Sequence, residues 1–266
     1  MALRALNIAA TGGRALMSQI DTIANNLANV NTTAFKRARA NFADLFYQQV
    51  QRAGFGEAGR NQSPTGLSFG TGVRLVSTEK LFDQGTLQST GRQLDVAVDG
   101  EGFLRIQLPD QTTLAFTRAG NLNVDAEGNL VTSDGFRVDP PITVPQNVTQ
   151  ILIDQTGLIQ GVDPQNPQNL EPLGQLELVR FLNPSGLEAM GDNLYRETPA
   201  AGPRVEGRAG VDQGFGLVRQ GFLEQSNVNV VKELVDLISA QRAFEINGTS
   251  IKTADEILQA VNNLRR

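Results

Sequence analysis

Two stretches of sequence set the fold of this 266-residue chain: LRALNIAATGGRALMSQIDTIANNLANV at residues 3–30 and VVKELVDLISAQRAFEINGTSIKTADEILQAV at residues 230–261. Both carry apolar residues at alternating steps of three and four. An apolar residue about every 3.5 positions forms a narrow seam on a helix, and a partner helix must cover such a seam. The pattern predicts helices over about 3–28 and from near Asn229 to about Asn263, capped by Ser226 or Asn227 and pairing as in a coiled coil.

The two seams are candidate assembly interfaces between copies of the chain. Apolar helical stripes usually face the core of their own domain. Here the seams lie at opposite ends of the chain, and a C-terminal helix of roughly 50 Å is longer than a central β domain needs for cover. The seam positions are Leu6, Leu16, Ile20, Ile23, Leu27, Val30, Leu234, Leu237, Phe244, Ile251, Leu258 and Val261. Gly12 and Gly13 interrupt the first helix as a close-packing device or as a tolerated kink.

The middle of the chain reads as β structure. From Val73 to about Gly221, short alternating apolar runs are separated by turn signals such as Glu127-Gly128-Asn129 and Asp134-Gly135. This predicts a compact all-β domain, either a sandwich or an irregular barrel. The fold class is therefore α+β. The predicted domains are residues 1–45 together with 222–266, an extended loop or hairpin segment at 46–75, and a β domain at 76–221.

A less regular region joins the first helix to the β domain. Phe35–Val50 reads as a short amphipathic, helix-like stretch, and Gln51–Gly72 as a Gly-, Ser- and Pro-rich loop of about twenty residues. Within this loop Phe55, Leu67 and Phe69 are apolar and would gain from burial. The loop also contains GFGEAG at residues 54–59, which matches the dinucleotide pattern GxGxxG. That pattern binds nucleotide only between a strand and a helix, so we give it no weight.

Composition narrows the chemistry. The chain has no Cys, His or Trp, so thiolate chemistry and the commonest general base and metal ligand are absent. Catalysis is thereby disfavoured, and we expect no catalytic residues, no cofactor and no metal. Asp99-Gly100-Glu101-Gly102 and Asp125–Asn129 are acidic, but these residue types form turns first of all.

Charge and hydropathy limit the partners. A net charge of −5 argues against a general nucleic-acid binder. The basic cluster of Lys36, Arg37 and Arg39 reads as solvated surface. The N-terminus lacks the continuous apolar core of a cleaved signal peptide, and no stretch is apolar enough for a membrane helix. We therefore expect a soluble protein that does not insert into membranes and that, if exported, uses no cleaved signal.

Several motifs resemble one known family. IANNLANVNTTAFKR (Ile23–Arg37) is similar to the N-terminal signature of bacterial flagellar axial proteins, which are rod, hook and hook-associated subunits. Residues 224–264 are similar to their C-terminal signature. LDVAVDGEGFLRIQLPD (Leu94–Asp110) and FTRAGNLNVDAEGNLVTSDGFRV (Phe116–Val138) resemble the start and the hairpins of their β domain. Ala34 stands where the family usually has Gly, and Phe244 where it often has Tyr.

Within the family, the length and the segment Asp44–Leu75 are most similar to the distal rod. The resemblance implies a rigid helical tube that transmits motor torque to the hook, with terminal helices inside and β domains outside. Phe55, Leu67 and Phe69 would belong to a rod-stiffening segment. The implied location is the basal body across the periplasm, after export as an unfolded chain. The implied partners are further copies of the chain, proximal rod proteins, the hook protein, a rod-capping protein, surrounding ring proteins and the flagellar type III export apparatus.

Two alternatives remain open from the sequence. The nearest is a proximal rod or hook subunit of the same family, which the Gln51–Gly72 segment would distinguish, since a hook must bend and a rod must not. A different class is a carbohydrate-active β-domain enzyme that uses pairs of Asp or Glu residues. An assay of polysaccharide or peptidoglycan hydrolysis would separate this enzyme from a structural subunit.

Overall fold

The chain folds into two compact units. The structure is a computed structural model that describes residues 2–52, 65–110, 113–163 and 170–264. The first unit combines residues 1–28, 38–79 and 229–266, and the second combines residues 29–37 and 80–228. Two terminal helices with strands between them confirm the predicted α+β class. Our division at residues 45, 75 and 221 stays a prediction.

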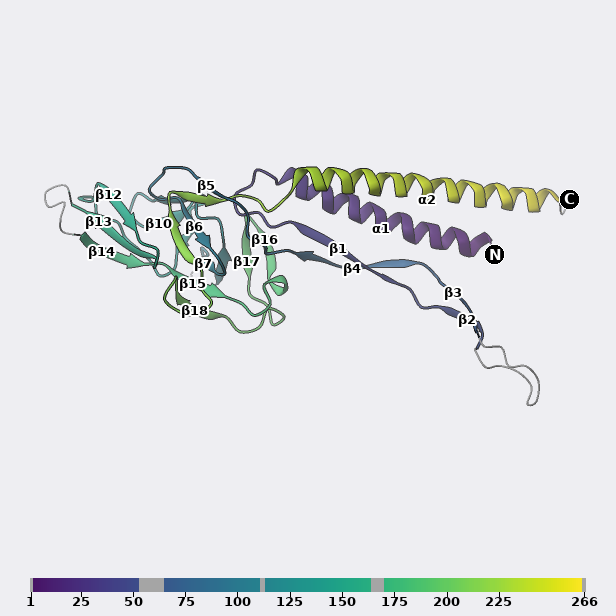
Figure 1. Ribbon diagram of the computed structural model, residues 1–266, viewed down its shortest axis with the longest axis horizontal. Coiled ribbons are helices and arrows are strands. Elements are labelled where there is room, and N and C mark those ends of the chain that lie inside the picture. The colour runs from purple at the N-terminus through teal and green to yellow at the C-terminus, as the bar shows by residue number, and fades with distance from the viewer. Residues whose placement is uncertain (1, 53–64, 111–112, 164–169, 265–266) are drawn as a thin grey trace. The chain divides into compact units, whose positions relative to one another are not determined.

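The first unit contains both long helices, α1 (Ala2–Ala28) and α2 (Val230–Leu264). Figure 1 shows them side by side and running in opposite directions. Asn26, near the end of α1, contacts Glu233 near the start of α2, and Gly12, earlier in α1, lies next to Asn247 further along α2. This confirms the predicted pairing of the two ends of the chain. The cap of α2 is Asn229, whose Oδ1 accepts a hydrogen bond from the backbone N–H of Lys232 at 3.1 Å. Our assignment of the cap to Ser226 or Asn227 was wrong by two or three residues.

Four strands complete the first unit: β1 (Ala38–Asp44), β2 (Gln48–Gln51), β3 (Leu67–Phe69) and β4 (Val73–Lys80). β1 pairs with β4 and β2 pairs with β3. The expectation of a helix-like stretch at Phe35–Val50 was therefore wrong. Arg39 and Asn41 both hydrogen-bond to Glu79 on β4, at 3.0 and 3.1 Å, which shows the two-residue period of a strand. The pairing with β4, distant in sequence, overrides the local helical pattern.

The second unit is built from short strands, as predicted. Its strands are β5 (Leu87–Ser89), β6 (Val96–Asp99), β7 (Phe103–Gln107), β8 (Leu114–Thr117), β9 (Leu122–Val124), β10 (Leu130–Thr132), β11 (Arg137–Val138), β12 (Gln150–Ile153), β13 (Leu158–Val162), β14 (Leu170–Gln175), β15 (Glu177–Arg180), β16 (Glu188–Gly191), β17 (Leu194–Arg196), β18 (Val205–Arg208), β19 (Leu217–Gln220) and β20 (Phe222–Glu224). A short 3₁₀ helix spans Pro184–Gly186. The two predicted turns join β9 to β10 and β10 to β11, and Gly128 and Gly135 have positive φ there.

The largest sheet holds nine strands in the order β16-β17-β8-β7-β11-β10-β9, with β15 joining both β7 and β18. A three-stranded sheet, β12-β13-β14, and the pairs β19-β6 and β20-β5 surround it. The main core is aliphatic and includes Val96, Ile106, Leu122 and Leu176. A second, aromatic core gathers around Phe116, which is fully buried. This aromatic core lies beneath the pocket described below.

Candidate assembly surface

Small and polar residues form the contact between α1 and α2. On α2 the line facing α1 repeats every seven residues: Glu233, Ala240, Asn247 and Ala254. Opposite Asn247, a Cβ added to Gly12 would lie 2.9 Å from its Nδ2, and that nitrogen donates to the Ala9 carbonyl at 2.8 Å. Of the two readings of Gly12, the structure supports close packing.

A buried polar contact fixes the register of the two helices. Asn26 is 1% exposed and donates through Nδ2 to Glu233 Oε2 at 3.2 Å and to the Ala38 carbonyl at 2.9 Å. Its Oδ1 accepts from the Ala38 N–H at 2.8 Å. A one-residue slip of either helix would leave these buried groups unpaired, which is costly. Sequence patterns carry no direct signal of this contact, because an Asn near the end of a helix usually serves as a terminator.

The opposite face of α2 is apolar and exposed. Val231, Val235, Ile238, Ile246 and Ile257 follow one another at intervals close to whole helical turns. Their exposed fractions are 72%, 57%, 56%, 66% and 54%. We call these five residues the open stripe. The apolar side chains of α2 that face away from α1 are thus left in water by the single chain. A series of exposed apolar side chains along one helix face marks a candidate site of association.

Most of the predicted seam residues are half-buried in the single chain. In the N-terminal part Ile23 is buried, while Leu6, Leu16, Ile20, Leu27 and Val30 are half-buried, with Val30 in a turn just after α1. On α2, Leu237, Ile251 and Leu258 are half-buried, whereas Leu234 and Phe244 are 41% and 40% exposed. Val261 lies in α2, but its side chain is outside the described part. Their role as an interface between copies stays a prediction, and the sequence analysis missed the open stripe.

The predicted stiffening segment begins and ends as a paired hairpin. β2 pairs with β3 through Gln48↔Phe69 and Gln51↔Leu67, so the hairpin, and not the extended loop, describes both ends of the segment. Phe69 is half-buried and Arg4 lies over its ring at 5.0 Å, while Leu67 is 46% exposed. Phe55 and the GFGEAG motif lie outside the described residues.

The basic cluster contains a buried ion pair. Lys36 is fully buried, and its Nζ lies 2.6 Å from Glu224 Oε1 and donates to the Asp83 carbonyl at 2.8 Å. Glu224 also meets Arg118 at 3.4 Å and accepts from the Gly85 N–H at 2.8 Å. Burial lowers the pKa of Lys36, and the Glu224 carboxylate acts in the opposite direction. Our reading of Lys36 as solvated surface was wrong, whereas Arg39 is exposed as expected.

The Lys36–Glu224 pair belongs to a junction within the second unit, between the segment that follows α1 and the segment that precedes α2. The Ala34 N–H donates to the Glu224 carbonyl at 2.8 Å, and the Arg37 N–H donates to Asn227 Oδ1 at 2.8 Å. Asn227 Nδ2 donates in turn to the Leu81 carbonyl at 2.8 Å. The segment after α1 and the segment before α2 are therefore fastened to each other.

The acidic turn at Asp125 serves local structure. Its carboxylate accepts from the side chain of Asn129 at 3.0 Å and from the backbone N–H groups of Asn129 and Glu127. These hydrogen bonds hold the pKa of Asp125 below its usual value. Among the described residues no three acidic side chains gather into a group that could hold a metal ion. None of the described helices has the length and hydropathy required to cross a membrane.

Comparison with protein families covers both ends and the middle of the chain. Residues 6–36 match the model of the flagella basal body rod protein, residues 97–161 that of the flagellar hook protein FlgE/F/G D1 domain, and residues 219–264 that of the flagellar basal body rod FlgEFG protein C-terminal region. The flagellar basal-body rod protein FlgG of Buchnera aphidicola from Acyrthosiphon pisum is 47% identical over 97% of this chain and 98% of its own length. The chain belongs to the flagellar basal-body rod protein family.

Other flagellar rod proteins align over nearly the full length. The proteins named FlgG of Caulobacter vibrioides and Bacillus subtilis are 45% and 38% identical, each over 99% of this chain and 100% of its own length. Both partners of the Asn26–Glu233 contact, and both partners of the Lys36–Glu224 pair, lie in regions that the rod-family models match. A solved structure of the Helicobacter pylori flagellar hook protein FlgE2 covers 71% of this chain and 43% of its own, at 12% identity and a TM-score of 0.24. That likeness is too weak to support an argument.

Proposed function

We propose that this chain is a structural subunit of the flagellar distal rod, which acts by polymerising into a rigid helical tube and not by catalysis. The open stripe on α2 carries the proposal. Its five apolar side chains are each more than half exposed in the single chain, and burial against a second copy would remove them from water. The full-length similarity to proteins named as basal-body rod proteins supports the same role.

In the proposed tube, the helix pairs form the inner wall and the β units form the outer wall. α2 is 35 residues long, or roughly 50 Å at 1.5 Å per residue, so one helix can contact several neighbours along the axis. Torque from the motor would pass through these contacts to the hook. The junction around Lys36 and Glu224 supports this role, because it ties the entry and exit segments of the second unit together.

The proposed partners and location follow from membership of the family. Besides copies of itself, the chain would meet proximal rod proteins, the hook protein, the rod-capping protein and the surrounding rings. It would reach its place across the periplasm through the flagellar type III export apparatus, without a cleaved signal peptide. Export as an unfolded chain fits the absence of cysteine, since no disulfide has to form before assembly.

Electron microscopy of the purified chain tests the proposal. We expect straight filaments from the wild-type chain and none from Ile238→Asp, because the new carboxylate would be buried against a neighbouring copy at a cost of roughly several kcal/mol. Gln241→Asp is the matched control, since it adds the same charge one helical turn away, at an exposed position on the flank of α2 outside the open stripe. Filaments from Ile238→Asp equal to those of the control would refute the role of the open stripe.

The segment Gln51–Gly72, with Phe55, Leu67 and Phe69, is proposed to stiffen the polymer. Bending a tube requires neighbouring subunits to slide along one another, and a segment that crosses from one copy to the next resists such sliding. The exposure of Leu67 in the single chain supports this idea. Deleting the segment Gln51–Gly72 should leave filaments that form but curve as a hook does. An unchanged persistence length in micrographs would contradict the stiffening role.

A further inference from the structure

Two apolar side chains stand out by their exposure. In the part of the chain that the structure describes, Phe46 and Leu182 are the most exposed large apolar residues, at 94% and 90%. Phe46 belongs to the first unit and Leu182 to the second. Burying such a side chain stabilises a protein or a complex by roughly 1.5–3 kcal/mol. Each of them would therefore gain from a surface that buries it.

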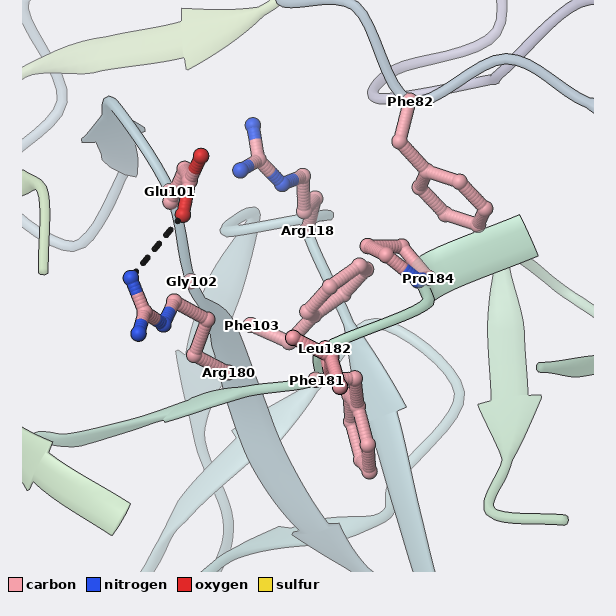
Figure 2. Close-up of a pocket in the computed structure, with 9 residues that line it drawn as sticks. All are labelled: Phe82, Glu101, Gly102, Phe103, Arg118, Arg180, Phe181, Leu182 and Pro184. Carbon is pink, nitrogen blue, oxygen red and sulfur yellow. Dashed lines mark hydrogen bonds and ion pairs between the residues drawn. The ribbon is translucent and has the colours of Figure 1, made fainter. Parts of the chain in front are cut away.

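Leu182 lies at the rim of an aromatic pocket in the second unit. The pocket has a volume of about 370 Å³. Figure 2 shows the rings of Phe82, Phe103 and Phe181 beside Leu182 and Pro184. Phe103 packs edge to face against Phe82 and Phe181, with ring centroids 5.4 and 6.1 Å apart. These contacts pre-form an apolar lining of a kind that accepts another aromatic ring.

The wall of the same pocket carries two arginines, Arg118 and Arg180, and one carboxylate, Glu101, and Arg118 also meets Glu224 at 3.4 Å. Arg118 is 5% exposed and donates through Nη2 to the Gly100 carbonyl at 2.6 Å, yet its Nε is buried without a hydrogen-bond partner. Arg180 also lines the pocket, is 38% exposed at its side chain, and pairs with Glu101 at 3.3 Å. An unused buried donor is costly, and a carboxylate is its strongest acceptor. The pocket therefore suits an aromatic ring that carries an acidic group close by.

Phe46 offers that combination. It lies between β1 and β2, two residues after Asp44, which is exposed and is the last residue of β1. Two hydrogen bonds hold this turn: Thr71 Oγ1 donates to the Phe46 carbonyl at 2.7 Å, and the Leu45 N–H donates to the Gly72 carbonyl at 2.8 Å. The backbone beneath the exposed ring is thus fixed, so little ordering entropy remains to be lost on docking.

We infer that Phe46 of one copy inserts into the aromatic pocket of another copy, with Asp44 facing the arginines of the pocket wall. This rests on the proposed function, since it names the surfaces through which neighbouring subunits meet. The ring that inserts and the pocket that receives it belong to different surfaces of the same chain. A contact of this head-to-tail kind leaves one free ring and one free pocket after every addition, and it therefore propagates into an open polymer.

Disulfide trapping tests the contact directly, because the chain has no cysteine of its own. One full-length chain carries Asp44→Cys, which keeps the Phe46 ring, and a second carries Leu182→Cys, and the two are mixed under mild oxidation. We expect a disulfide-linked heterodimer in the mixture, and a ladder of linked oligomers from a chain carrying both substitutions. The control pair is Tyr47→Cys with Leu170→Cys, both exposed positions outside the proposed contact, which should give little linked product.

Three outcomes would overturn the inference. One is filaments without linkage above the control pair, which leaves the proposed function standing. Another is a double-substituted chain that links only to itself, since Phe46 would then occupy its own pocket. The third is no filaments and no linked dimer even at high concentration, which also contradicts the proposed function. As a second measurement, Phe46→Ser should raise the critical concentration for assembly roughly tenfold or more, and Tyr47→Ser should raise it much less.

Discussion

At the scale of single residues, Lys36 shows what the sequence hides. It stands in a basic cluster with Arg37 and Arg39, and a run of charges normally faces solvent. Its partner Glu224 is 188 residues away, and only the meeting of both chain ends brings the two together. Arg39 pairs with Glu79 at the surface instead. Lys36 is therefore a buried structural charge and Arg39 a solvated one, and composition alone cannot tell the two apart.

This difference predicts unequal costs of substitution. Lys36→Met should lower the free energy of unfolding by roughly 3–5 kcal/mol, because Glu224 would keep a buried charge with Arg118 as its remaining cationic partner. Arg39→Met is the matched control, and it removes an exposed pair that is worth about 1 kcal/mol or less. Urea unfolding followed by circular dichroism measures both. Equal losses in the two variants would contradict the buried role of Lys36.

Ala34 gives a physical reason for the family's usual glycine. Its φ is 56° and it is 1% exposed, so a side chain occupies a backbone conformation that favours glycine. The left-handed conformation costs an alanine roughly 1–2 kcal/mol. The Ala34 N–H bond to the Glu224 carbonyl helps to hold the turn in that conformation. Ala34 thus adopts the backbone conformation that the family's glycine favours, and its hydrogen bond in the junction is kept.

At the scale of elements, periodicity predicted the helices well and their contact poorly. α1 and α2 fall within a few residues of the predicted bounds, because heptad patterns are long and strong signals. The contact itself runs through Ala240, Asn247 and Gly12, since close approach needs small side chains. The strand at Ala38–Asp44 was missed because its ladder partner, β4, is more than thirty residues away. Local patterns cannot report such pairings.

The close approach predicts opposite effects of the same substitution at two helical glycines. Alanine at either position adds about 1 kcal/mol of helix propensity. At Gly248 the new methyl group meets no atom of the chain within 4 Å, whereas at Gly12 it would displace Asn247 and its hydrogen bond to Ala9. Filaments of Gly12→Ala should therefore disassemble at a lower temperature than those of Gly248→Ala, as followed by light scattering. The reverse order would show that Gly12 does not set the helix contact.

At the scale of the whole molecule, the chain leaves a set of large apolar side chains exposed outside its hydrophobic cores. The second unit buries two hydrophobic clusters, while α2 leaves the open stripe in water. The contact between α1 and α2 runs through small and polar residues, and most of the leucine and isoleucine side chains of these helices are only half-buried in the single chain. Paired helices with so little burial are marginal in water. We therefore expect the chain ends to become stably folded only on assembly, which keeps a transported subunit from polymerising early.

Hydrogen exchange of the same chain, first as a proven monomer and then as a filament, tests this account most directly. In the monomer, the amides of α1 and α2 should exchange freely, while the strands of the second unit and the junction around Lys36 stay protected. In the filament, protection should appear throughout α2, including Val231, Val235 and Ile238. Helix amides already protected in the monomer, with no gain of protection in the filament, would contradict assembly through the open stripe.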